Sequence, residues 1–185
     1  MKKLALTDFA KYRYPSALEL SPDGRYLTFA LKDVDREGDG YRWNLWLYDL
    51  ERRESRQITQ GDDQRKAVWE DNTHILYKTT EPDEALRARG FEEEWTVYHR
   101  LNVCTGEDRE AFRLPMSVSG LWKMDEGRYV FTGETHLDRP NLLELTGEAL
   151  EKELVRRQQT RGYKVLTELP LCENGVGMFN QTRNT

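Results

Sequence analysis

The stretch that decides the fold is the turn Ser21-Pro22-Asp23-Gly24, which is followed by Arg25-Tyr26-Leu27-Thr28-Phe29-Ala30-Leu31. In the turn, proline presets φ, aspartate bonds to its own backbone, and glycine accepts a positive φ. The next seven residues are largely β-branched, aromatic or aliphatic, and they alternate, which predicts a strand. On this strand, Leu27, Phe29 and Leu31 are expected on one face, and Tyr26, Thr28 and Ala30 on the other.

A second strand is predicted after a polar loop at residues 33–40. It is apolar on both faces, with Trp43, Leu45 and Leu47 on one and Trp46, Tyr48 and Leu50 on the other. Because an antiparallel strand usually leaves one face wet, two dry faces predict a sheet packed between two other sheets. The shorter, polar residues 55–59 are expected to form an outer edge strand.

The same pattern returns twice along the chain. Turn aspartates stand at Asp23, Asp71 and Asp125, with spacings of 48 and 54 residues, close to the ~40–50 residues of a propeller blade. Strand patterns follow each turn, at residues 73–78 and 95–101 in the second unit and at 128–132 in the third. Tryptophans recur with the pattern and are expected to pack between blades; they are Trp43, Trp46, Trp69, Trp95 and Trp122.

The repeat predicts an all-β fold, a partial β-propeller of about three four-stranded blades plus the start of a fourth. We expect residues 1–185 to form one incomplete propeller domain. Its blades are placed at about 14–60, 66–114 and 118–169, and a further blade starts at 170–185. Short helices are expected in two insertions, at residues 82–89 and at 147–159, where Thr146 caps the second and Leu150 and Leu154 stand four apart.

Composition narrows the class of protein. The 185 residues carry a formal net charge of −5 with a pI near 5.4, which argues against a dedicated nucleic-acid binder. No apolar run approaches the ~18 residues of a membrane span, and the first residues lack the apolar core of a signal peptide. Two cysteines, Cys104 and Cys172, cannot build a disulfide framework and are expected as free thiols. We therefore expect a cytoplasmic chain with neither nucleic-acid nor membrane partners.

The turn and its flanking strands resemble the propeller repeats of periplasmic Tol-type proteins and of the prolyl oligopeptidase family of serine peptidases. Residues 163–180 look like the "ELPFW-x-NG-x-G-x-x-N" run of the bacterial acylaminoacyl-peptidase and dipeptidyl-peptidase branch. Leu171 and Cys172 stand at its two aromatic positions, a departure from that pattern. Residues 90–97 resemble the same branch, and the resemblance covers nearly the whole chain.

In that family, a propeller precedes an α/β-hydrolase domain that carries most or all of the Ser-Asp-His triad. The resemblance therefore implies an N-terminal fragment of a longer peptidase. Its partners are the missing blades and the hydrolase domain, and its substrates are short peptides. Open blade faces would also allow self-association.

The chain itself lacks a nucleophile elbow, since none of its five serines has glycine at both −2 and +2. We therefore predict no catalytic residue in this chain. The histidines His74, His99 and His136 have no metal-ligand spacing and are expected as ordinary strand residues. Gly175-x-Gly177 lacks the context of a dinucleotide loop and is expected to form a turn. No cofactor and no metal are predicted.

Glu92, Glu93 and Glu94 are the candidate binding residues. In dipeptidyl peptidases of the family, a propeller glutamate pair binds the free amino group of the substrate. Carboxylates suit that role because a buried ammonium needs charge-assisted acceptors. The alternative is a solvated charge run at an insertion.

The preferred function is a non-catalytic propeller that controls substrate access in a serine peptidase for short or N-acylated peptides. The alternative is a Tol-like β-propeller interaction module without a hydrolase partner domain.

Overall fold

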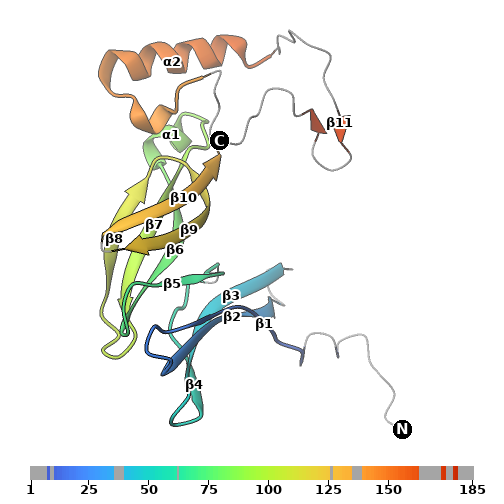
Figure 1. The fold of residues 1–185 in the computed structure, drawn as a ribbon. Coiled ribbons are helices and arrows are strands. Elements are labelled where there is room, and N and C mark those ends of the chain that lie inside the picture. The colour runs from blue at the N-terminus through green and yellow to red at the C-terminus, as the bar shows by residue number, and fades with distance from the viewer. Residues whose placement is uncertain are drawn as a thin grey trace. The chain divides into compact units, whose positions relative to one another are not determined.

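The computed structural model describes residues 8, 11–35, 40–61, 63–125, 127–134, 139–162, 172–173 and 177–178 (Figure 1). The chain divides into two compact units. The first consists of Met1–Thr79, Val97–Phe112 and Lys123–Arg128, and the second of Thr80–Thr96, Arg113–Trp122 and Tyr129–Thr185. Most of the described structure is antiparallel β-sheet.

The first sheet is a four-stranded meander. Its strands are β1 (Tyr14–Leu20), β2 (Tyr26–Asp35), β3 (Gly40–Asp49) and β4 (Glu54–Gln57), paired in that order. The long β2–β3 ladder pairs Ala30 with Leu45 and Phe29 with Trp46. The edge strand β4 is exposed at all four residues, as the polar sequence predicts.

The predicted turn joins β1 to β2. Gly24 has φ +72°, and Asp23 accepts hydrogen bonds from the Ser21 hydroxyl at 2.7 Å and the Arg25 amide at 3.1 Å. These bonds lower the pKa of the Asp23 carboxyl. Ser21 also accepts from the Tyr26 amide at 2.9 Å, so the whole turn is closed by local hydrogen bonds.

The second sheet repeats this design with β5 (Ala67–Trp69), β6 (His74–Pro82), β7 (Glu94–Asn102) and β8 (Asp108–Leu114), again in sequence order. Its turn aspartate, Asp71, accepts from the amides of Thr73 at 2.7 Å and His74 at 2.8 Å. Partial burial opposes ionisation of Asp71, but these hydrogen bonds outweigh it and hold the pKa at about 2.

The third repeat is described as a two-stranded hairpin, β9 (Ser117–Asp125) and β10 (Arg128–Glu134). Here Asp125 accepts from the side chain of Arg128, with Arg128 Nε 2.7 Å from Oδ1. Farther on, β11 (Cys172–Glu173) pairs with β12 (Gly177–Met178). The remaining residues of the predicted 163–180 run lie outside the described residues.

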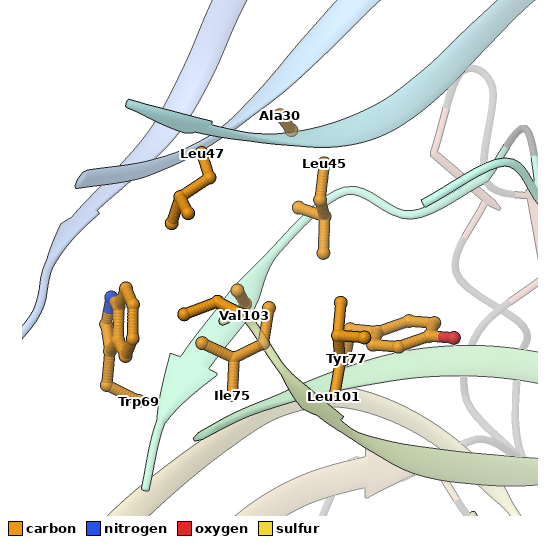
Figure 2. Close-up of a cluster of buried hydrophobic side chains, with 9 residues drawn as sticks. Ala30, Leu45, Leu47, Trp69, Ile75, Tyr77, Leu101 and Val103 are labelled. Carbon is orange, nitrogen blue, oxygen red and sulfur yellow. The ribbon is translucent and has the colours of Figure 1, made fainter. Parts of the chain in front are cut away.

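The main core lies in the first unit, where one face of the first sheet meets residues of the second sheet (Figure 2). Side chains from β2 and β3 contact side chains from β5, β6 and β7 across this layer. Burying each large apolar side chain contributes about 1.5–3 kcal/mol. The buried members are Ala30, Leu45, Leu47, Ala67, Trp69, Ile75, Tyr77, Leu101 and Val103.

The prediction that β3 lies between two sheets is wrong for the described structure. Leu45 and Leu47 are buried, but Trp46 and Tyr48 on the opposite face are only half-buried. In the described residues, Trp46 is covered by the Phe29 ring, stacked at 6.4 Å, and by the Arg13 guanidinium at 6.0 Å, rather than by another sheet. The prediction that the tryptophans pack between blades also holds only in part, since Trp69 is buried and Trp122 is 46% exposed.

Helices form at both predicted insertions. They are α1 (Glu84–Ala88), capped by the Asp83 side chain, and α2 (Gly147–Thr160), preceded by the 3₁₀ helix η2 (Leu142–Glu144). Thr146 stands at the N-cap of α2 but makes no capping bond with its side chain.

The antiparallel four-stranded sheets give the fold of a partial β-propeller, as predicted. The single-domain assignment and the blade boundaries remain predictions.

Candidate functional site

The predicted glutamate run lies in the second unit, between α1 and the start of β7. Asp83 begins the insertion, and its amide donates to the Glu93 carbonyl at 3.1 Å, which closes the base of the loop. Its carboxylate accepts from the Leu86 amide at 2.9 Å and starts α1. Gly90, with φ +85°, then turns the chain toward β7, which begins at Glu94.

Glu93 is bound by an arginine of α2. Arg157 donates from Nη1 to the Glu93 carboxylate, from Nε to Glu153 at 3.0 Å, and from Nη2 to the Pro140 carbonyl at 2.6 Å. The Arg157 side chain is 12% exposed. One guanidinium thus joins the glutamate loop, the segment before η2, and α2.

Glu153 is the second carboxylate of this network and is 8% exposed. It accepts from Arg156 at 2.7 and 2.8 Å and from Arg157 at 3.0 Å. The hydrogen bonds from Arg156, followed by those from Arg157, outweigh the effect of burial and lower the pKa of Glu153 to about 2. The Glu153 carboxylate is therefore ionised at neutral pH.

The structure does not bring the three predicted glutamates together. The Glu93 carboxylate is neutralised by Arg157, whereas Glu92 and Glu94 are exposed and form no ion pair within the described part of the chain. Only Glu92 and Glu94 thus present carboxylates that an external cation can approach without displacing an internal one. The assignment of all three residues to amino-group binding stays a prediction.

Sequence reasoning missed Arg157 and Glu153. The spacing of Glu153 from Arg156 and Arg157, three and four positions along a predicted helix, does indicate ion pairs on one face. The link to Glu93 has no such signal, because the two residues are 64 positions apart.

A small apolar pocket lies beside the network, among α1, η2 and the start of α2. It has a volume of about 180 Å³. The lining is mostly leucine, with Asp83 and Arg89 as its charged members, and Arg89 is bound to Glu151 at 2.9 and 3.0 Å. The lining residues are Asp83, Ala85, Leu86, Arg89, Leu142, Leu143, Leu145 and Leu150.

Two of the three histidines form polar pairs in the second sheet. His74 Nδ1 lies 2.9 Å from Asp71 Oδ2, and His99 Nδ1 lies 3.1 Å from Asp108 Oδ1. His136 and Gly175 lie outside the described residues. Among the described residues, no group of three or more His, Cys, Asp or Glu side chains is arranged to hold a metal. No described helix has the length and apolar character needed to cross a membrane.

Comparison with solved structures supports the fold. No family model and no curated protein matches the chain. Among solved structures, it is similar to an acylaminoacyl peptidase from Pyrococcus horikoshii, with a TM-score of 0.54 and 14% identity over 77% of this chain. A second similar structure is the β-propeller domain of the Trilobed protease from Pyrococcus furiosus. Its TM-score is 0.49 at 13% identity, covering 67% of this chain and 35% of that one.

The chain spans about a fifth of the Pyrococcus horikoshii peptidase, of which the match covers 20%. At this level of identity the likeness concerns the fold. This likeness supports the fold that the sequence predicts.

Proposed function

We propose that this chain is a non-catalytic propeller part of a serine peptidase acting on short or N-acylated peptides, and that it controls the access of substrate. The observation that carries the proposal is the fold likeness to an acylaminoacyl peptidase over 77% of this chain. The sequence fits a non-catalytic role, because no serine stands in Gly-x-Ser-x-Gly. In this proposal, the partner is an α/β-hydrolase domain together with further blades.

The gene tests the proposal most directly. Sequence downstream of codon 185 is expected to encode further Asp-Gly turns and then a Gly-x-Ser-x-Gly elbow. A natural gene that ends there with no remnant of a hydrolase would favour the alternative, a Tol-like interaction module.

Activity of the purified chain provides a second test. Aminoacyl- and acylaminoacyl-nitroanilides should show no turnover, and a fluorophosphonate probe should leave the mass unchanged, because acyl transfer needs an activated nucleophile. Stoichiometric labelling of any serine would contradict the non-catalytic assignment.

The same proposal assigns the free amino group of a peptide to the glutamate run, with Glu92 and Glu94 as the available carboxylates. A dipeptide with a free N-terminus should then bind more tightly than its N-acetylated form. The difference should disappear in the double variant Glu92→Gln/Glu94→Gln and persist in Glu148→Gln, a control at an exposed position on α2. Calorimetry measures both affinities, and equal binding of the two dipeptides to the unmodified chain would exclude this role.

A further inference from the structure

The side chain of His74 joins two turns at one end of the second sheet. One is the Asp71 turn before β6, and the other is the turn at residues 103–106, between β7 and β8. His74 Nδ1 lies 2.9 Å from Asp71 Oδ2, and His74 Nε2 lies 3.1 Å from Asn102 Nδ2. Each ring nitrogen therefore has a polar partner, one at each turn.

The Asp71 carboxylate decides what His74 Nδ1 carries. Burial opposes ionisation of Asp71, but hydrogen bonds from the amides of Thr73 and His74 outweigh it and hold the pKa of this carboxyl at about 2. An ionised carboxylate only accepts hydrogen bonds. His74 Nδ1 therefore bears a hydrogen and donates it to Asp71.

The Asn102 amide decides what His74 Nε2 carries. Asn102 Oδ1 accepts from the backbone amides of Cys104 at 2.9 Å and Thr105 at 3.0 Å. Because a backbone N–H only donates, the atom that faces these amides is the oxygen, and the group that faces His74 is the NH₂ donor. His74 Nε2 thus accepts with its lone pair, and the ring is neutral with its one hydrogen on Nδ1.

The turn that Asn102 closes also contacts the first sheet. Val103 belongs to the main core, and its carbonyl accepts from the Arg56 side chain of β4 (Figure 2). The Cys104 sulfur lies 3.9 Å from the Tyr26 hydroxyl of β2. A movement of the Asn102 side chain therefore acts on a turn that touches both sheets.

The other charged side chains around the ring have partners of their own. The Glu70 carboxylate accepts from Arg100 of β7 at 2.7 Å, and the Glu70 carbonyl accepts from Lys123 of β9. The titratable groups in and beside the 103–106 turn are Cys104, Glu107, Tyr26 and Arg56. The Asp71 carboxylate contacts the ring directly and can remain its partner when the ring gains a proton.

We propose that protonation of His74 is a pH switch for the turn at residues 103–106. A second hydrogen, on Nε2, would point at the Asn102 NH₂ group, and two donors cannot share one hydrogen bond. Asn102 must then leave the ring or reverse its amide, and reversal takes Oδ1 away from the amides of Cys104 and Thr105. Histidine ordinarily changes charge between about pH 5 and 8, so the switch operates in mild acid. This inference concerns the chain itself and does not depend on a hydrolase partner.

Nuclear magnetic resonance of the whole 185-residue chain, labelled with ¹⁵N, tests the proposal. At pH 7.5, long-range ¹H–¹⁵N spectra should show His74 with its hydrogen on Nδ1 and none on Nε2. Hydrogen exchange then compares pH 7.5 with pH 5, as protection relative to an unstructured amide at the same pH. Protection of the Cys104 and Thr105 amides should fall about fivefold at pH 5, because each loses a hydrogen bond. The Gly24 amide, which donates to the Ser21 carbonyl at 2.9 Å in the first sheet, should stay within twofold.

The variant His74→Gln removes the titrating ring, and protection of the two amides should then be the same at both pH values. His99→Gln is the matched control, because it removes another histidine of this sheet whose Nδ1 pairs with an aspartate, Asp108 at 3.1 Å. The fall at pH 5 should persist in the control.

The ring spectra of the unmodified chain need no variant, so a folding defect in His74→Gln leaves the test intact. A hydrogen on Nε2 at pH 7.5, or a ring that stays neutral at pH 5, would overturn the proposal. Unchanged protection of the Cys104 and Thr105 amides while the ring titrates, or the same fall in folded His74→Gln, would overturn it as well.

Discussion

At the scale of single residues, the Arg157 side chain joins three parts of the second unit. Its guanidinium bonds to Glu93, Glu153 and the Pro140 carbonyl, whereas the neighbouring Arg156 bonds to Glu153 and is 52% exposed. Removing one partner of a buried ion network leaves uncompensated charge, which costs more than the loss of an exposed pair.

Arg157→Met should therefore lower the free energy of unfolding by about 2–4 kcal/mol, and the matched control Arg156→Met by less than about 1 kcal/mol. Urea titrations followed by circular dichroism at 222 nm provide the comparison. Equal losses in the two variants would mean that the contacts of Arg157 to Glu93 and Pro140 contribute nothing.

The Glu153 carboxylate makes the same network sensitive to acid. Its folded pKa of about 2 lies below the ~4.3 of an unfolded glutamate, so its stabilisation is present above pH ~4.3 and is lost as the pH falls toward 2. The stability difference between the unmodified chain and Glu153→Gln, about 1–3 kcal/mol at pH 7, should shrink steadily between pH 5 and pH 2.5. A difference that stays constant over this range would show that the carboxylate does not titrate as the geometry requires.

At this scale, the sequence predicts the contacts of some side chains and not those of others. Asp23 and Asp71 were predicted because a turn aspartate bonds within two or three positions of itself. The contact of Glu93 with Arg157 was not predicted, because it depends on how an insertion packs, and periodicity carries no information about that.

At the scale of elements, α2 is attached by the Arg157–Glu153 network, by the Arg89–Glu151 ion pair and by one small apolar cluster. Leu154 is 2% exposed and packs with Leu86 and Leu142, while Val155 on the next position is 50% exposed. The i to i+4 spacing of Leu150 and Leu154 predicted this face correctly, and both leucines contact the cluster. Thr146 was predicted to cap α2. It does stand at the N-cap position, but its hydroxyl makes no hydrogen bond to the helix.

Leu154→Ala should destabilise the attachment of α2 by about 2–4 kcal/mol, because it leaves a cavity beside the buried Leu86 and Leu142. Val155→Ala removes similar chemistry from a solvent-facing position and should change stability by less than about 0.5 kcal/mol. Hydrogen exchange of the α2 amides, read by mass spectrometry, should accelerate in the first variant and stay unchanged in the second. Equal exchange rates in the two variants would contradict a role for the buried Leu154 side chain in holding α2.

At the scale of the molecule, the core of the first unit covers one face of the first sheet within the described residues. The repeat in the sequence predicted sheets stacked face to face, and the contact of Leu45 and Leu47 with the second sheet agrees with it. The opposite face was expected to be covered because β3 is apolar on both sides. Apolar residues on both faces of a strand show that each face can be buried. They cannot show whether a partner sheet is present.

Leu45→Ala, at a fully buried position, should lower stability by about 2–5 kcal/mol. Leu20→Ala, at a position 55% exposed, should leave stability nearly unchanged.

We expect the face of the first sheet that carries Trp46 and Tyr48 to drive self-association. Light scattering of the unmodified chain should then show a mass that rises with concentration, and Leu20→Lys should reduce that rise. A monomer at every concentration would exclude that face as a contact between copies.

The sequence order of the strands bears on how the chain is made. Both four-stranded sheets pair neighbouring strands only, so each requires short loop closures and little conformational search. The first sheet is complete at Gln57, yet the partners of its Leu45 face include Leu101 and Val103. On a ribosome adding ~5–20 residues per second, that apolar face waits on the order of seconds for its cover. This interval during synthesis is when the nascent chain is most exposed to chaperones and to aggregation.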